Sequence, residues 1–118
     1  MTKIYGIKNC NTVKKAFNWL LENNIQYQFH DYKKEGVTKE KLEQFIEEFG
    51  WEKVLNCKGT TWRQLSLEIQ ESVINKESAI NLMHEKTSII KRPIIELKEG
   101  KLIGFDESEY EKAFKIKK

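Results

Sequence analysis

The stretch Ile4-Tyr5-Gly6-Ile7-Lys8-Asn9-Cys10-Asn11-Thr12 decides how the chain begins to fold. Ile4 to Ile7 has the pattern of a short buried strand, and a helical run begins near Asn11, so Cys10 lies where strand gives way to helix. A thiol there meets free backbone N–H groups and the positive end of the helix dipole, which favour the thiolate. The alternative is a small apolar filler. The polar neighbours Lys8 and Asn9 favour a reactive cysteine.

The bulk composition limits the classes of protein to which the chain can belong. Its 118 residues fit one domain with a hydrophobic core of its own. The 21 basic and 18 acidic side chains are mixed along the sequence, which argues against direct nucleic-acid binding. No apolar stretch reaches the length of a membrane span and no signal peptide is evident, so we expect a cytoplasmic protein that binds no membrane. Two cysteines exclude a framework of several disulfides.

The first third of the chain has the pattern of a strand, a helix and a second strand. Apolar residues recur at helical spacing from Val13 to Leu21, and Asn23-Asn24 ends this helix. Residues Ile25 to Tyr32 alternate well enough to predict a strand. A connection of this length normally makes the two strands parallel.

The rest of the chain predicts helices followed by a hairpin and a final helix. Thr38 has the pattern of an N-cap for a helix that ends at Gly50. The block between residues 51 and 83 contains short apolar clusters at helical spacing, which predict several small helices, and these clusters include Leu65, Ile69 and Val73. From Ser88 onward, apolar runs separated by a turn at residues 99–100 predict two strands, and a last helix begins after Asp106.

Four separated blocks of sequence together resemble the arsenate reductase-like family, which includes the Spx and YffB proteins. They are residues 5–12, 29–32, 58–63 and 90–93, and they are most similar to the YffB branch, described as glutathione-dependent thiol reductases. The resemblance implies an α/β, thioredoxin-like fold: a mixed four-stranded sheet with a helical insertion between the second and third strands. It implies a single domain over residues 1–118, with the core in 1–35 and 88–118 and the insertion in 36–87.

The resemblance carries part of the family's site over to this chain. Cys10 matches the nucleophile, and Arg92 matches one arginine that binds the oxyanion in arsenate reductases. The other two arginines have no evident counterparts, because Asn56 and Phe105 stand near their positions. Position 13 is Val, so the Cys-x-x-Cys switch typical of Spx is absent from the loop. The resemblance therefore implies the thiol chemistry more strongly than arsenate binding.

Further residues complete the predicted site around Cys10. The only proline, Pro93, precedes the third strand. Base rates favour a trans bond, whereas a thioredoxin-type fold would place a cis-proline opposite the cysteine. Cys57 is predicted to be packed beside Val54 and Leu55, although a role in resolving a disulfide stays open. Nothing has metal-ligand spacing. The residues expected to bind substrate or an anion are Lys8, Asn9, Asn11, Thr12, Lys58, Arg92 and Pro93.

These observations lead to one preferred function and several alternatives. We expect an oxidoreductase that uses Cys10 as its nucleophile, with no bound cofactor and with glutathione as co-substrate, because the loop has no second cysteine. The alternatives are an Spx-like, non-catalytic regulator that binds RNA polymerase, a true arsenate reductase that acts on the small oxyanion, and a pure interaction module. An interaction module would leave Cys10 with ordinary thiol reactivity.

Overall fold

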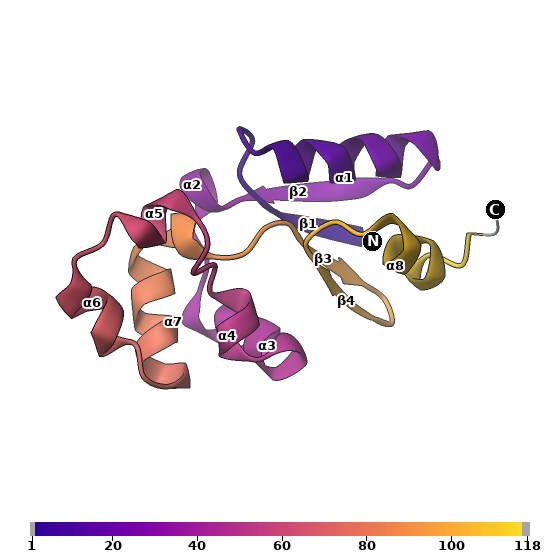
Figure 1. The fold of residues 1–118 in the computed structure, drawn as a ribbon. Coiled ribbons are helices and arrows are strands. Elements are labelled where there is room, and N and C mark those ends of the chain that lie inside the picture. The colour runs from indigo at the N-terminus through magenta and orange to yellow at the C-terminus, as the bar shows by residue number, and fades with distance from the viewer. Residues whose placement is uncertain (1, 117–118) are drawn as a thin grey trace. The chain divides into compact units, whose positions relative to one another are not determined.

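The computed structural model describes residues 2–116, which form two compact units. The first unit contains the described residues up to Asp31 and from Arg92 onward, and the second contains Tyr32–Lys91. The first unit contains β1 (Thr2–Gly6), α1 (Asn11–Glu22), β2 (Tyr27–Asp31), β3 (Ile94–Leu97), β4 (Gly100–Ile103) and α8 (Glu107–Ala113) (Figure 1). The predicted order of elements in this unit is confirmed.

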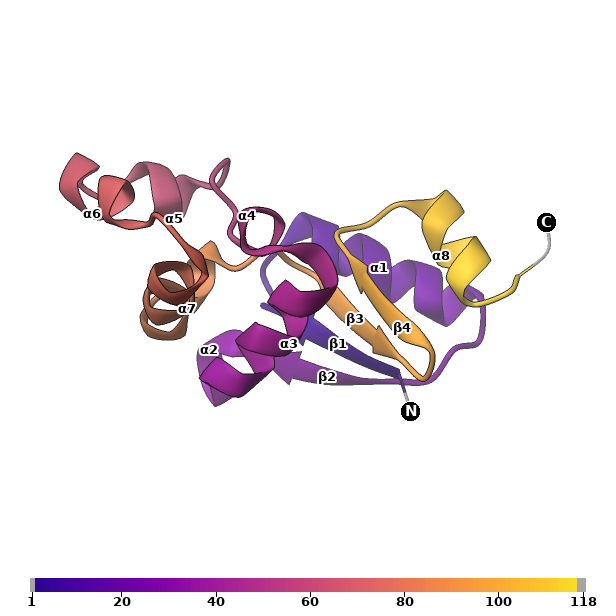
Figure 2. The ribbon, with the colours of Figure 1, turned by 90° about the horizontal axis from the view of Figure 1, so that it is seen from below.

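The first unit is built on a mixed four-stranded sheet in the order β2-β1-β3-β4 (Figure 2). β1 pairs with β2 in parallel and with β3 antiparallel, and β3 pairs with β4 antiparallel. Across the sheet, Ile4 is the register partner of both Phe29 and Ile95, and Ile95 is the partner of Leu102. Register partners point to the same face of a sheet, so these four residues form one apolar row. The sheet agrees with the expected α/β fold class.

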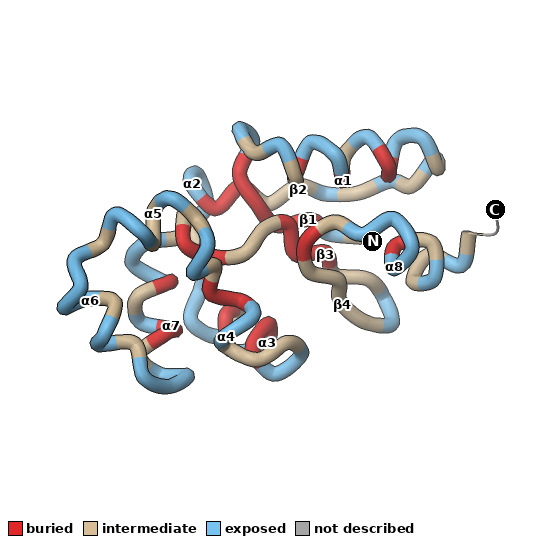
Figure 3. Tube along the Cα trace, in the orientation of Figure 1, coloured by how far each residue is buried: buried red, intermediate tan, exposed pale blue. Residues whose placement is uncertain are grey.

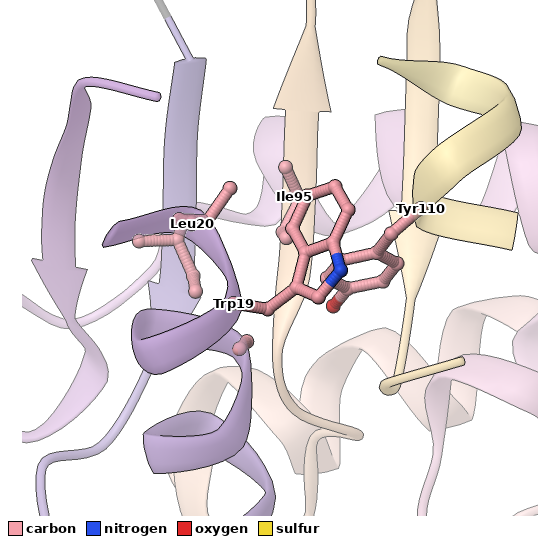
Figure 4. Packing of buried hydrophobic residues seen from close by; sticks show 6 residues of the cluster. Trp19, Leu20, Ile95 and Tyr110 are labelled. Atoms are coloured by element: carbon pink, nitrogen blue, oxygen red, sulfur yellow. The ribbon is translucent and has the colours of Figure 1, made fainter. Parts of the chain in front are cut away.

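The helices α1 and α8 cover this apolar row. Trp19 and Leu20 of α1 and Tyr110 of α8 pack with Ile4 and Ile95 in one core cluster (Figure 4). The rings of Trp19 and Tyr110 meet edge to face, with centroids 5.4 Å apart. The Tyr110 hydroxyl also donates a hydrogen bond to the carbonyl oxygen of Gly104, which ties α8 to the loop that follows β4.

The end of α1 explains why β2 is shorter than the predicted strand over residues 25–32. Asn24 has φ of 57°, the amide of Asn24 bonds the carbonyl of Leu21, and the amide of Ile25 bonds the carbonyl of Leu20 at 2.9 Å. This is the Schellman motif, with its usual apolar residue just after the left-handed position. Ile25 therefore belongs to the helix end. At the other end of the strand, the four-residue helix α2 (Tyr32–Glu35) starts directly.

The second unit consists of helices. They are α2, α3 (Lys39–Phe49), α4 (Trp51–Val54), α5 (Thr60–Arg63), α6 (Leu67–Ser72), α7 (Lys76–Glu85) and the 3-10 turn η1 (Thr87–Ile89). Thr38 and Asn75 cap α3 and α7 through their side-chain oxygens, as does Ser66 for α6. The residues just after α4 are bonded to the last residues of the unit: the amide of Asn56 bonds the carbonyl of Ile89 at 2.8 Å, and the amide of Lys91 bonds that of Val54 at 2.7 Å.

The several small helices predicted for the middle block are confirmed, but one apolar cluster within it does not form a buried stripe. Leu65, Ile69 and Val73 fall before, within and after α6, and α6 contains no buried residue. The short helix ends too soon for the spacing to build a face. α3 and α7 contribute three buried residues each, whereas α5 and α6 contain none (Figure 3). None of the helices formed by residues 2–116 has the length and hydrophobicity that a membrane span requires.

Candidate active site

Cys10 occupies the N-cap of α1, as the sequence predicts. Its backbone is extended, with φ of −135° and ψ of 123°, and its carbonyl oxygen accepts the first intrahelical hydrogen bond from the amide of Lys14 at 3.0 Å. The residue is half-buried, so the sulfur is held by the protein and still reaches solvent. The Cys10 sulfur thus takes the place that a Ser or Asp oxygen usually has at a helix start.

Two backbone amides and one guanidinium act on the Cys10 sulfur. Partial burial by itself raises the pKa of the thiol, but the amide of Val13, the Arg92 side chain and the amide of Thr12 all favour the charged form. Their combined effect is larger, so the pKa of Cys10 lies below its usual value. The neutral thiol closes no side-chain capping bond. The amides therefore act mainly on the thiolate, which is a far stronger acceptor than the thiol.

The charge pattern around the helix start is one-sided. The first turn of α1 contains no acidic residue, and Lys14 at its end and Lys15 just after it are exposed. Lys8 and Asn9 are exposed in the loop that leads to Cys10. No carboxylate of this turn therefore opposes the thiolate. The proximity of Lys8, Asn9, Asn11 and Thr12 to Cys10 follows from their place in the chain, while their contacts with a substrate stay a prediction.

Arg92 and Pro93 enter the site from the strand side. The Arg92–Pro93 peptide bond is cis, which answers the question that the sequence left open. Pro93 is buried, and its carbonyl oxygen accepts a hydrogen bond from the amide of Gly104 at 2.8 Å. This bond joins the start of β3 to the residue just after β4. The half-buried Arg92 therefore extends from a backbone that the sheet holds in place.

Gly6 is a site residue that the sequence reasoning missed. It is buried at the end of β1, and an ideal Cβ at this position would lie 2.9 Å from Cγ2 of Val13 and 3.7 Å from Cβ of Arg92. The buried stretch that includes Gly6 runs from β1 into the loop before α1 (Figure 3). The available signal is a glycine inside the predicted strand Ile4–Ile7, because a glycine in a strand often marks a close approach of another part of the backbone.

Asn56 and Phe105 stand where the resemblance to arsenate reductases implies two further arginines. Both side chains make other contacts in this structure. Asn56 accepts a hydrogen bond from the amide of Lys58 at 3.3 Å through Oδ1, so it braces its own loop. Phe105 packs its ring against Tyr110, with centroids 4.9 Å apart. Neither side chain carries charge, so Arg92 is the one guanidinium that acts on the Cys10 sulfur within the described residues.

Lys58 and Cys57 lie in the loop before α5, in the second unit. Both side chains are exposed. The prediction that Cys57 is packed is therefore wrong: Val54 and Leu55 at the end of α4 are buried, but burial does not continue to Cys57, two residues later. Desolvation raises the pKa of the Cys57 thiol, in contrast to Cys10. The part of the chain that the structure describes contains no cluster of three or more candidate metal ligands. A role for Lys58 in the site stays a prediction.

The sequence matches a known family over most of its length. A sequence model described as "ArsC family" matches residues 5–113. An uncharacterised protein of Haemophilus influenzae is 46% identical over 115 residues, which are 97% of this chain and 99% of that protein. The global transcriptional regulator Spx of Lactiplantibacillus plantarum is 28% identical over 112 residues, covering 92% of this chain and 83% of Spx.

Solved structures agree with the sequence comparison. A structure of a YffB protein is 42% identical and superposes with a TM-score of 0.91, over 96% of this chain and 98% of that one. The recognition from four sequence blocks is therefore confirmed, including the likeness to YffB and Spx proteins.

Proposed function

Because this chain belongs to the ArsC family, we propose that it is a cytoplasmic thiol oxidoreductase that uses Cys10 as its single nucleophile and glutathione as its co-thiol. The observation that carries the proposal is the set of groups around one sulfur: the amides of Val13 and Thr12 and the guanidinium of Arg92 lower the pKa of a half-buried cysteine at a helix N-terminus. A packing cysteine needs none of these groups.

The proposed reaction is two successive thiol–disulfide exchanges. The Cys10 thiolate attacks the glutathione sulfur of a mixed disulfide, forming Cys10–S–S–glutathione and releasing the substrate thiolate, which takes a proton from water. A second glutathione thiolate then attacks the glutathione sulfur of this intermediate. Glutathione disulfide leaves, and the Cys10 thiolate is restored. The substrate mixed disulfide is reduced to its thiol, and one free glutathione is oxidised, since the other half of the glutathione disulfide comes from the mixed disulfide itself.

The residues of this chain fit each step of the proposed reaction. Position 13 is Val, so the loop supplies no resolving cysteine and the second thiol has to come from outside. Arg92 and the two amides stabilise Cys10 as the leaving thiolate in the second exchange, since a thiol of lower pKa leaves faster. The carboxylates of glutathione suit the cationic side chains of Lys8 and Arg92.

Arsenate reduction is the weaker alternative for the same cysteine. A single guanidinium acts on the Cys10 sulfur, and Asn56 and Phe105 offer no further charge where the family's other arginines would be. A multiply charged oxyanion needs several such donors for tight binding, whereas a thiol or disulfide sulfur needs none. We therefore expect turnover of a glutathione mixed disulfide to exceed that of arsenate.

The test is a side-by-side assay of the full chain with glutathione and either a glutathione mixed disulfide or arsenate. We expect turnover of the disulfide by wild type and by Cys57→Ser, and loss of turnover in Cys10→Ser. Cys57 is the matched control because it is the only other cysteine, is exposed and has a raised pKa. No turnover by wild type, or full turnover by Cys10→Ser, would contradict the proposal.

A regulatory function is the second candidate, and it rests on the relatedness to Spx across nearly the whole chain. A regulator of this kind would bind RNA polymerase directly and would show no thiol turnover. A pull-down with purified RNA polymerase, run beside the activity assay, separates the two functions. Polymerase binding by both wild type and Cys10→Ser, without turnover, would favour the regulator.

A further inference from the structure

Building on the thiol chemistry proposed above, we propose that Gly6 is a positioning residue for Cys10: the missing side chain lets the first turn of α1 and the Arg92 backbone approach β1 closely enough to surround the sulfur. The atoms nearest to an ideal Cβ at Gly6 belong to Val13 and Arg92. Gly6 acts through these two neighbours.

The geometry at Gly6 leaves no room for a methyl group. Its ideal Cβ would lie 2.9 Å from Cγ2 of Val13, whereas carbon atoms in favourable contact are about 3.5–4.0 Å apart. Gly6 does not have a positive φ, unlike Gly36, Gly50 and Gly104. The requirement for glycine therefore comes from space and not from backbone conformation.

Val13 has little freedom to avoid such a methyl group. It is fully buried, and a β-branched side chain in a helix has one strongly preferred rotamer. A Cβ at position 6 would push the first turn of α1 outward by roughly 0.5–1 Å to restore ordinary contact. The Val13 amide, which faces the Cys10 sulfur, belongs to that turn and moves with it. Hydrogen bonds weaken steeply when their geometry is lost.

The second neighbour of Gly6 is Arg92, whose guanidinium also stabilises the Cys10 thiolate. Cβ of Arg92 lies 3.7 Å from the ideal Cβ position of Gly6, which is ordinary contact. Gly6 thus lies between Val13 and Arg92. The amide of Val13 and the guanidinium of Arg92 act on the same sulfur, that of Cys10. A displaced first turn also separates the sulfur from Arg92, because Cys10 directly precedes that turn.

The test measures the pH dependence of Cys10 alkylation in full-length protein with Cys57→Ala as the background. Gly6→Ala is expected to move the midpoint upward toward the free-thiol value of about 8.5 and to slow alkylation at pH 7 several-fold. Adding Val13→Ala to Gly6→Ala removes the clashing methyl groups and is expected to return the midpoint to that of Val13→Ala alone. Gly100→Ala is the matched control, because its Cβ would meet nothing within 4 Å.

Each outcome decides the proposal. An unchanged midpoint in folded Gly6→Ala overturns it, as does a raised midpoint that Val13→Ala does not reverse. If Gly6→Ala does not fold, the comparison is between Val13→Ala and the double variant: equal midpoints support the proposal, and a raised midpoint or an unfolded double variant overturns it. If the parent protein itself shows a midpoint near 8.5, the proposed function fails, which is distinguishable from a failure of the Gly6 inference.

Discussion

At the residue scale, the site depends on a few groups around one sulfur. Burial opposes ionisation of Cys10, and the amides of Val13 and Thr12 with Arg92 outweigh it. Cys57 shows the contrast, because desolvation acts on it without such partners and raises its pKa. The two thiols therefore differ in reactivity for local physical reasons, which selective alkylation at neutral pH would reveal.

Removing the guanidinium is expected to weaken the Cys10 thiolate. Arg92→Gln should raise the pKa of Cys10, because both its hydrogen bond and its charge favour the thiolate. Arg92→Lys should give an intermediate value, since an ammonium keeps the charge and loses the planar fork. The pH midpoint of alkylation in the Cys57→Ala background measures the change. Arg63→Gln, the only other arginine substitution available, serves as control. Equal midpoints for Arg92→Gln and the control would contradict the role of Arg92.

At the element scale, most helices begin and end through local side-chain and backbone bonds. Thr38, Ser66, Asn75 and Asp106 accept hydrogen bonds from amides three residues onward, at 2.9 to 3.2 Å. Cys10, the N-cap of α1, makes no such bond. The backbone amides in the first turn of α1 are therefore available to the Cys10 sulfur and to an approaching substrate.

The cap of α7 offers a test of this local contribution. Asn75 and Ser78 form a reciprocal capping box, with the amide of Ser78 2.9 Å from Oδ1 of Asn75. Asn75→Ala is expected to lower the free energy of unfolding by about 1 kcal/mol. Asn81→Ala, at an exposed position inside the same helix, should leave it unchanged or raise it slightly. Urea denaturation measures both variants, and equal effects would show that the cap contributes nothing.

At the scale of the whole molecule, the first unit is built from segments far apart in sequence. The hydrogen bond from the Tyr5 hydroxyl to Glu96 Oε1, at 2.7 Å, joins residues 91 positions apart. β1 likewise pairs with β3 across the whole inserted second unit. The sheet and the core that α1 and α8 cover must therefore form through long-range contacts.

Neighbouring leucines of α1 test where that core lies. Leu20 is fully buried in the cluster with Trp19 and Ile95, whereas the side chain of Leu21 is 64% exposed. Leu20→Ala should destabilise the protein by about 2–5 kcal/mol, because it leaves a cavity. Leu21→Ala should cost about 0.5 kcal/mol or less. Chemical denaturation distinguishes them, and similar losses for the two variants would place the core elsewhere.

The ionisation of Cys10 is expected to make stability depend on pH. The pKa of Cys10 is lower in the folded protein than in the unfolded chain, so between the two values the unfolded state binds more protons. The stabilising contribution is fully present above the unfolded value of about 8.5 and is lost as pH falls through the folded pKa. The difference in unfolding free energy between the Cys57→Ala parent and its Cys10→Ser variant should therefore rise with pH. A constant difference would contradict a folded thiolate.

Local signals were sufficient for the order of the elements and for the place of Cys10. Thr38, Asp106 and the Asn23-Asn24 pair act through bonds within five residues, so their effects are readable from the sequence alone. The resemblance of four sequence blocks also predicted the family and its fold correctly. The same local reasoning missed the exposure of Cys57, which depends on where the chain turns after α4.

Only the tertiary structure decided which distant residues surround the sulfur. Gly6 contacts Val13 and Arg92 because the pairing of β1 with β3 and the packing of α1 on the sheet bring them together. Phe105 packs against Tyr110 at the position where the resemblance to arsenate reductases implies an arginine. Contacts of this kind depend on how elements pack across tens of residues, and the residue types near one position in the sequence do not determine them.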